Sequence, residues 1–275
     1  KAMREAQKCG HQIAICSGRS HKDIQSILEE HGLEASIISG NGAMVFHNGE
    51  FVKQLFLPEK LVAELIDFLK GQGAFIEIYT DQGIIMEENG RDVLYGEIDR
   101  LAKVNALEEK AAKHQADVIL SQNFITFVPD IPSLPLSELR VYKMNGITFN
   151  LPKRNRLMEA METRTDLSVT TGGLVTVEFG HSQTNKGYGL RILAKHLQIP
   201  LVDTFVIGDN HNDISMFKIA GTGVAMGNAE ESVKSLAKYV TDDNNHDGVA
   251  NAIRKYLIPS GHSGFDGKVC CGSCH

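Results

Sequence analysis

The sequence predicts an α/β protein with a doubly wound parallel sheet and a second domain inserted into it. Short apolar runs alternate with helical spacings at the start of the chain and again after residue 197, as in β-α-β crossovers. The stretch between them, residues 58–180, mixes helices and strands without this alternation. The simplest arrangement is one sheet built from both ends of the chain, with an α+β domain inserted between its halves.

The first half of this sheet is predicted from residues 12 to 57. The apolar run 12–16 and the run 36–38 are expected as strands, and a helix over 20–31 separates them and stops at Gly32. Residues 44–46 and 51–57 flank an Asn-Gly pair at 48–49, which favours a two-residue hairpin turn.

The second half and the inserted domain are predicted in the same way. The expected strands of the second half are 202–208, 222–226 and 238–241, with helices over 211–220, 229–237 and 246–257. The inserted domain opens with a helix at Pro58. It continues with strands over 74–79, 83–87, 140–149 and 174–179, a helix over 152–164 and a proline-rich loop over 129–136.

Composition limits the classes of function. The 275 residues are 42% hydrophobic and 23% charged, which is ordinary for a globular protein. A formal net charge of -6 argues against non-specific binding of nucleic acid or of anionic membranes. The longest apolar run falls short of the ~18 residues of a membrane span. Five cysteines do not suggest a disulfide framework in a chain of this size, so we expect a cytoplasmic protein.

Three of the five cysteines lie in the last six residues. Cys271-Gly-Ser-Cys274-His275 matches the haem-attachment pattern C-x-x-C-H. A haem domain needs a pocket and more chain around the motif. We therefore expect residues 258–275 to be a disordered or metal-scavenging tail.

Lys186 opens a predicted helix that also contains Gly187 and Gly189. A lysine in the first turn opposes the helix dipole at ~0.3–1 kcal/mol, and each glycine costs about 1 kcal/mol against alanine. An anion bound at the start of this helix would explain all three residues. An exposed lysine placed there by chance is the alternative.

The loop after the strand 202–208 holds Asp209, Asn210, His211, Asn212 and Asp213. Carboxylates with intervening amides at a strand end suit a hard cation such as Mg²⁺. The alternative is that Asp209 or Asn210 only caps the following helix over 211–220, for which a single side chain is enough. Ser17-Gly18, at another strand-to-helix turn, offers a hydroxyl and an amide to a phosphate oxygen, although any tight turn uses the same pair.

Taken in order, these motifs resemble the haloacid-dehalogenase (HAD) superfamily of phosphatases. The matching segments are Ser17-Gly18-Arg19, Asn41-Gly42-Ala43, Lys186-Gly187 and Gly208-Asp209-Asn210-His211-Asn212-Asp213. Gly227-Asn228-Ala229 and Asp247-Gly248-Val249-Ala250 extend the likeness to the Cof-type sugar-phosphatase branch. The resemblance covers about residues 1–257. It implies a Rossmann-like three-layer core of residues 1–57 and 181–257, and a large α/β cap domain of residues 58–180.

The resemblance also implies Mg²⁺-dependent hydrolysis of small phosphate monoesters, such as sugar phosphates, through an aspartyl-phosphate. It implies catalytic roles for Lys186, Ser17 and Asp213 and a metal-binding role for Asp209 and Asp213. The implied phosphate-binding residues are Ser17, Gly18, Asn41, Gly42, Lys186 and Asn212.

One motif of the family is missing. The Asp-x-Asp-Gly-Thr strand that carries the nucleophile precedes the opening helix in the family, and the chain contains no Asp-x-Asp. Residues 1–9 look like the second half of a helix, so we expect the chain to be a fragment whose nucleophile lies upstream of Lys1. The alternative is a catalytically inactive phosphate-ligand-binding or regulatory protein of the same fold.

Overall fold

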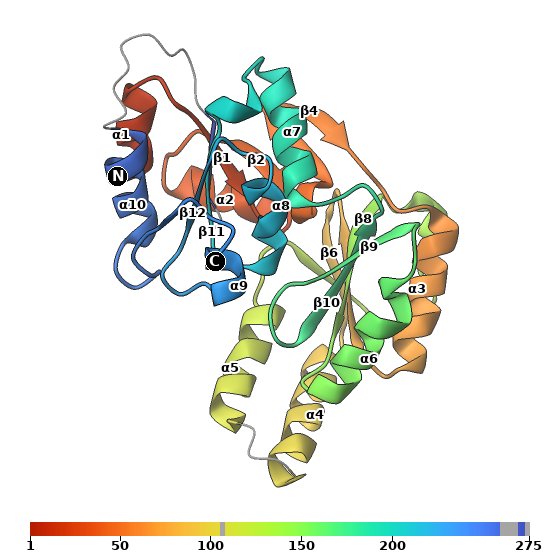
Figure 1. Ribbon diagram of the computed structural model, residues 1–275. Helices are drawn as coiled ribbons and strands as arrows, with labels where there is room; N and C mark the ends of the chain where they lie inside the picture. The colour runs from red at the N-terminus through yellow and green to blue at the C-terminus, as the bar shows by residue number, and fades with distance from the viewer. Residues whose placement is uncertain (105–107, 259–268, 273–275) are drawn as a thin grey trace. The chain divides into compact units, whose positions relative to one another are not determined.

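The computed structural model describes residues 1–104, 108–258 and 269–272. The chain forms two compact units, and each is described by itself. Unit 1 comprises Lys1–Gln54 and Thr184–His275, and unit 2 comprises Leu55–Gln183. In Figure 1 unit 1 runs from red to orange and again from teal to blue, and unit 2 runs from orange through yellow to green.

Unit 1 is built on an eight-stranded sheet with the order β13-β12-β11-β14-β1-β2-β3-β4. Neighbouring strands are parallel except at the pairs β2–β3 and β3–β4, which are antiparallel. The predicted Asn-Gly hairpin turn lies between β3 and β4, with φ of 48° at Asn48 and 87° at Gly49. The strands are β1 Gln12–Cys16, β2 Ser36–Ser39, β3 Met44–His47, β4 Glu50–Gln54, β11 Phe205–Gly208, β12 Thr222–Ala225, β13 Tyr239–Val240 and β14 Val269–Gly272.

Helices cover both faces of this sheet and complete three layers. On one face, α1 (Ala2–Lys8), α2 (His21–Glu30) and α10 (Gly248–Ala252) pack on the side chains of Ile13 and Ile15 and their neighbours. On the other face, α7 (Lys186–His196), α8 (Ile214–Phe217) and α9 (Glu231–Lys234) pack on Ala14, Cys16 and Val206. This is the predicted α/β fold with its doubly wound sheet.

The sheet has a switch point between β11 and β1. From β1 the chain passes through α2 to β2, and from β11 it passes through α8 to β12, on the opposite face and in the opposite direction along the sheet. In such sheets the crevice beyond the carboxyl ends of the strands on either side of the switch point is the usual place for a ligand. These ends are Cys16 and Gly208.

The expectation of a disordered tail over 258–275 is wrong for residues 269–272, which form β14. This strand lies between β1 and β11 and pairs in parallel with both. The physical reason is that β1 and β11 would otherwise leave buried backbone groups unpaired in the middle of the sheet. Residues 273–275, and with them the end of the C-x-x-C-H motif, lie outside the described residues.

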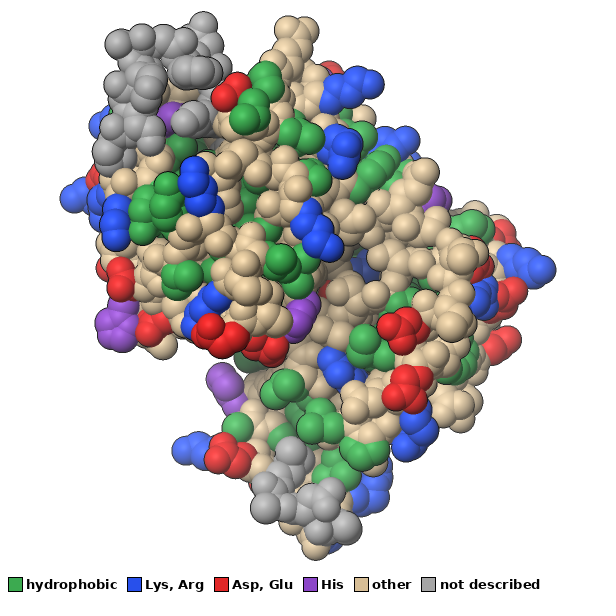
Figure 2. All heavy atoms as spheres, in the orientation of Figure 1, with side chains coloured by type: hydrophobic (Ala, Val, Ile, Leu, Met, Phe, Trp, Pro, Cys, Tyr) green, Lys and Arg blue, Asp and Glu red, His purple; other side chains and the backbone are tan. Residues whose placement is uncertain are grey.

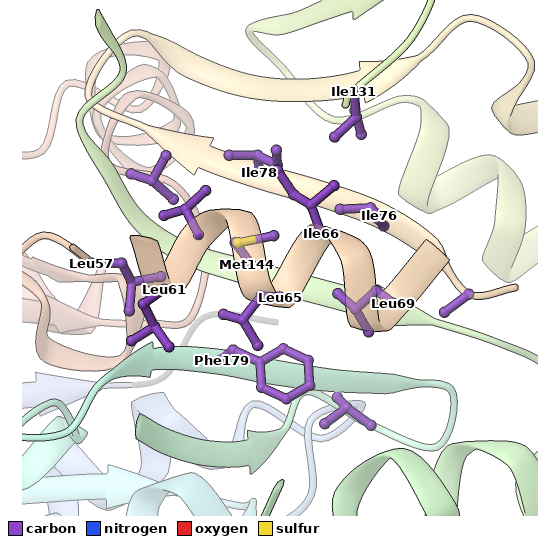
Figure 3. Close-up of a cluster of buried hydrophobic side chains, with 14 of the residues drawn as sticks. Leu57, Leu61, Leu65, Ile66, Leu69, Ile76, Ile78, Ile131, Met144 and Phe179 are labelled. Atoms are coloured by element: carbon purple, nitrogen blue, oxygen red, sulfur yellow. The ribbon is translucent and has the colours of Figure 1, made fainter. Parts of the chain in front are cut away.

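Unit 2 contains a six-stranded sheet with the order β7-β6-β5-β8-β10-β9. Its core is packed under α3 (Glu59–Gly71), whose Leu61, Leu65 and Leu69 face the sheet side chains in Figure 3. The predicted strands appear as β5 Phe75–Thr80, β6 Gly83–Glu87, β8 Val141–Ile147 and β10 Thr176–His181, and the predicted helix as α6 Leu151–Glu162. Elements that the sequence did not predict are α4 Gly90–Val104, α5 Glu109–Leu120, β7 Ile125–Val128 and β9 Leu167–Thr171.

The visible surface in Figure 2 carries charged side chains of both signs. Figure 2 shows Lys and Arg side chains interspersed with Asp and Glu on the visible face. Of the helices that the structure describes, none combines the length and the apolar character that crossing a membrane requires.

Candidate active site

The loop after β1 is tied to the loop after β2. The Ser17 amide donates to the Ile38 carbonyl at 2.8 Å, and the Asn41 amide donates to the Ser17 carbonyl at 3.2 Å. The Ser17 hydroxyl is buried and accepts from the Arg19 amide at 3.2 Å, which wraps the backbone tightly around Gly18. Ser17, Gly18 and Asn41 therefore lie together at the carboxyl edge of the sheet.

Asn41 and Gly42 lie against the start of α7. Both have positive φ, 54° and 98°. A Cβ atom on Gly42 would lie 2.3 Å from the Asn185 carbonyl oxygen, so only glycine fits between this loop and the helix. Asn185 caps α7 by accepting from the Tyr188 amide at 2.8 Å, and Lys186 is the first helical residue.

The two glycines that follow Lys186 have a packing role that the sequence argument missed. A Cβ atom at Gly187 would lie 2.3 Å from the Ser215 carbonyl oxygen, and one at Gly189 would lie 2.3 Å from Cγ2 of Ile38. These glycines let α7 approach α8 and β2 closely. Their cost in helix propensity is thus no evidence for a bound anion, and that argument rests on Lys186 alone.

Lys186 and Asp213 form a buried ion pair. Lys186 Nζ lies 2.7 Å from Asp213 Oδ1, and the two side chains are 2% and 0% exposed. Removing both charges from water is costly unless each is neutralised by a partner. Here the pair joins the start of α7 to the loop after β11.

The other oxygen of Asp213 organises its own loop. Oδ2 accepts from the amides of Asp209 and Asn210, both at 3.0 Å. Asn210 is the N-cap of the turn 211–213 in a capping box with Asp213. The capping interpretation is therefore correct for Asn210 and Asp213, and it leaves Asp209 and Asn212 to be explained.

Asp209 is oriented by a residue to which the sequence argument gave no role. Asn228 Nδ2 donates to Asp209 Oδ2 at 2.9 Å, and Asn228 Oδ1 accepts from the Asn244 amide at 3.1 Å. Asn228 follows β12, the strand next to β11. The available signal in the sequence was an amide residue two positions after the predicted strand 222–226, which lies beside the strand that carries Asp209.

Asn212 connects the two halves of the site and carries an unsatisfied atom. Its Nδ2 donates to Asn41 Oδ1 at 3.2 Å. Its Oδ1 is buried and has no hydrogen-bond partner in the part of the chain that the structure describes. A buried acceptor without a donor is costly in a finished core, so this oxygen is a candidate ligand for a cation or for a bound water.

Cys16, at the end of β1, is not a candidate nucleophile. It is fully buried, and burial raises the pKa of its thiol to about 12, with a smaller upward effect from Asp213 opposed by Lys186. Because the thiolate is the reactive form, this thiol stays inert near neutral pH.

A second polar cluster lies on the sheet of unit 2. Glu77, Lys143, Asn145 and Glu178 are each 5% exposed or less. Lys143 Nζ lies 2.9 Å from Glu178 Oε1, and Asn145 Nδ2 donates to Glu77 Oε2 at 2.6 Å. These polar residues interrupt strands that are otherwise apolar, and they match none of the motifs in the sequence.

Comparison with known proteins identifies the family to which this chain belongs. Residues 1–253 match the family model of the haloacid dehalogenase-like hydrolases. The chain is 32% identical to the phosphatase YwpJ of Bacillus subtilis (strain 168), over 93% of this chain and 91% of the relative.

Two further matches extend this result. The chain is 28% identical to the 5-amino-6-(5-phospho-D-ribitylamino)uracil phosphatase YwtE of the same organism, over 94% and 90% of the two chains. A solved haloacid dehalogenase-like hydrolase from B. subtilis, 32% identical, superimposes with a TM-score of 0.82 over 93% of this chain and 91% of that one. The chain belongs to the haloacid dehalogenase-like hydrolases.

Proposed function

We infer that the activity of this protein is Mg²⁺-dependent hydrolysis of small phosphate monoesters through an aspartyl-phosphate. The observation that carries the proposal is the buried Lys186, held by Asp213 at the switch point of the sheet, where the loops with Ser17 and Asn41 meet. An ammonium fixed at this position can neutralise a phosphoryl group, and phosphoryl transfer depends mainly on positioning and charge neutralisation.

The proposed phosphate site is made of residues from three loops. The Ser17 hydroxyl and the Gly18 amide supply donors from the β1 loop, and Asn41 and Gly42 line the site from the β2 loop. Lys186 supplies the positive charge, and Asn212 completes the site through its contact with Asn41. Ser17, Lys186 and Asp213 are the proposed catalytic residues, with Asp213 acting by holding Lys186 and the loop in place.

The proposed Mg²⁺ ligand is Asp209. The donor set fits a hard cation, because the loop that carries Asp209 also carries the buried Oδ1 of Asn212, which has no hydrogen-bond partner among the described residues. Asp213, the second metal ligand expected from the sequence, is the weaker candidate because both of its oxygens accept hydrogen bonds within the protein. When bound, the ion would add positive charge beside the phosphate oxygens.

The nucleophile is the part that the chain itself does not supply, since its sequence contains no Asp-x-Asp. A covalent aspartyl intermediate divides hydrolysis into two easier steps and requires that carboxylate. Without it, the same residues would bind phosphate and do no chemistry, which is the alternative of an inactive binding protein. The phosphatase names of the relatives favour catalysis.

The name of one relative supports a proposed substrate class. YwtE is named for a phosphorylated ribitylaminouracil, and a small phosphorylated metabolite of this kind is the proposed substrate here. We assign to unit 2 the role of the family's cap domain, and place the activity in the cytoplasm on the cysteine usage of the chain.

The test is phosphate release from p-nitrophenyl phosphate by the chain with an Asp-x-Asp-Gly-Thr segment joined before Lys1. We expect turnover that requires Mg²⁺, and a loss of at least ~100-fold in kcat/KM on Asp209→Asn. Asp203→Asn is the matched control, because Asp203 lies before β11, at the opposite end of that strand. Mg²⁺-dependent activity that survives Asp209→Asn would refute the metal role.

A further inference from the structure

A cavity of about 450 Å³ lies at the amino edge of the sheet of unit 1. Its lining includes Gln12 and Ser36, the first residues of β1 and β2, and Asn48 in the turn between β3 and β4. The proposed phosphate site is at the carboxyl edge, where Cys16 and Ser39 end the same two strands. The cavity is therefore separate from that site, and the proposed function does not use it.

One part of the lining is apolar. Ile13 of β1, Leu28 of α2 and Ile37 of β2 contribute to it and are 4%, 8% and 2% exposed. Leu33 and Phe46 are half-buried and add further apolar surface. A concave site of a few hundred Å³ that combines apolar surface with a few polar groups is the usual form of a site for a small organic ligand.

The polar part of the lining carries two negative charges. Glu29 and Glu34 contribute carboxylates, and no described Lys or Arg side chain lines the cavity. Among the described residues neither carboxylate forms an ion pair, and Glu29 Oε1 accepts from the neutral side-chain amide of Gln25 at 2.9 Å. A concave surface lined by charges of one sign concentrates its electric field and attracts ligands of the opposite sign.

The histidine in the lining does not offset this charge. His47 Nδ1 lies 2.8 Å from the Ser36 hydroxyl, and burial, with a further effect from His196, lowers the pKa of the His47 imidazole. The ring is therefore neutral near pH 7. Arg4, in α1, donates to the carbonyl oxygen of Gly32 at 3.1 Å and is not part of the lining.

The backbone around the cavity is held in place by hydrogen bonds. Helix α2 ends in a Schellman motif, in which the Leu33 amide donates to the Leu28 carbonyl at 2.9 Å and the Gly32 amide donates to the Glu29 carbonyl at 3.0 Å. Gln7 Nε2 donates to the Glu34 carbonyl at 2.6 Å and so joins α1 to the segment before β2. A cavity that is formed before binding loses little free energy to rearrangement.

We propose that this cavity binds an organic cation, a primary amine attached to an apolar group of about the size of one aromatic ring. The apolar group lies on the side chains of Ile13, Leu28 and Ile37, and the ammonium lies beside the carboxylates of Glu29 and Glu34. An anion of the same shape is repelled by the two carboxylates, and a neutral molecule gains nothing from them.

The experiment uses the complete chain, labelled with nitrogen-15, and three probes of similar shape. Phenethylamine is the cation, phenethyl alcohol is its neutral counterpart, and hydrocinnamate is the anion. We expect the amine to cause saturable amide shifts in residues 33–37 and 46–49, and to bind roughly fivefold more tightly than the alcohol. The anion should bind more weakly than both. Shifts in these segments that do not saturate, or equal affinities for amine and alcohol, would overturn the proposal.

Variants test the role of the two carboxylates. The chain with both Glu29→Gln and Glu34→Gln changes exposed positions, where substitutions cost little stability. We expect it to bind the amine roughly fivefold more weakly and the alcohol as the wild type does. Glu30→Gln is the matched control, because Glu30 is the exposed neighbour of Glu29 and does not line the cavity. An unchanged affinity of the double variant, or an equal loss in Glu30→Gln, would refute the assigned charge contacts.

The result does not depend on phosphatase activity. Excess Mg²⁺ and inorganic phosphate should leave the affinity for the amine unchanged, since the residues proposed to bind them lie at the other edge of the sheet. If instead phosphate or Mg²⁺ displaces the amine, and the amine shifts the amides of residues 209–213, the probe occupies the proposed phosphate site and the second site does not exist.

Discussion

Lys186 Nζ and Asp213 Oδ1 are 2.7 Å apart in the interior of unit 1, and the second oxygen of Asp213 holds the amides of Asp209 and Asn210. One carboxylate therefore fixes both the positive charge of the site and the loop that carries the proposed metal ligand. A pair that served stability alone could be replaced by apolar side chains without loss. Apolar side chains could not replace its connection between the start of α7 and the loop after β11.

The first prediction concerns this pair. Asp213→Asn leaves the Lys186 charge buried without a counter-charge, and we expect the free energy of unfolding to fall by about 3–5 kcal/mol. Urea unfolding measures the change. Glu5→Gln is the control, because it breaks the exposed pair with Arg254 and should leave the unfolding midpoint nearly unchanged. Similar midpoints for the two variants would show that the Lys186–Asp213 pair does not stabilise the fold.

The second prediction separates backbone strain from steric contact at the phosphate loop. Gly42 and Gly10 both have positive φ, 98° and 85°, where an alanine is strained by ~1–2 kcal/mol. At Gly42 a Cβ atom would also lie 2.3 Å from the Asn185 carbonyl oxygen, whereas at Gly10 it meets nothing within 4 Å. We expect Gly42→Ala to lower the melting temperature more than Gly10→Ala does. Equal shifts would mean that the loop and α7 can move apart freely.

Much of this fold is predictable from local patterns. The alternation of strands and helices in unit 1, the Asn48-Gly49 turn and the polar strand ends all have short-range signals. Helix α5 had almost no such signal in the sequence. The residues that it buries are Ala112 and Ala116, and alanines add little to an apolar periodicity. In α4 the buried positions Leu94 and Ile98 are surrounded by charged residues, so its signal was equally weak.

The features of the site also divide into those with a local signal in the sequence and those without one. The sequence pointed to the residues of the proposed phosphate site, because each motif is local, and the structure brings the loops with Ser17 and Asn41 together. It could not show that Gly187 and Gly189 serve close packing, since Ser215 and Ile38 are distant in sequence. Nor could it place β14, because the pairing of this strand with β1 and β11 joins residues that are distant in the sequence.

The third prediction concerns pH and unit 2. Burial raises the pKa of Glu77 above its usual value of 4.5, although Asn145, Lys143, Gln122 and Tyr79 lower it in part. The folded state therefore holds this proton more tightly than the unfolded state. The free energy of unfolding should then fall as pH rises from about 4.5 through the folded-state pKa.

Glu77→Gln removes this titration and keeps the shape of the side chain. Relative to the wild type, we expect the variant to gain stability progressively above pH 4.5, as measured by urea unfolding between pH 4 and 8. Glu59→Gln, at an exposed position on α3, controls for the loss of a carboxylate. A difference between Glu77→Gln and wild type that does not change with pH would contradict the raised pKa.

The fourth prediction tests how Asp209 is oriented. Asn228 donates to Asp209 Oδ2 and is itself held by the backbone amide of Asn244. Outer partners of this kind commonly change metal affinity by 10–100-fold. We expect Asn228→Ala to weaken Mn²⁺ binding, measured by electron paramagnetic resonance as a substitute for Mg²⁺, by roughly tenfold or more. Asn244→Ala keeps the backbone amide and so should bind Mn²⁺ as the wild type does. If both variants lose affinity equally, the loop 242–247 contributes through its side chains, and the positioning role of Asn228 is wrong.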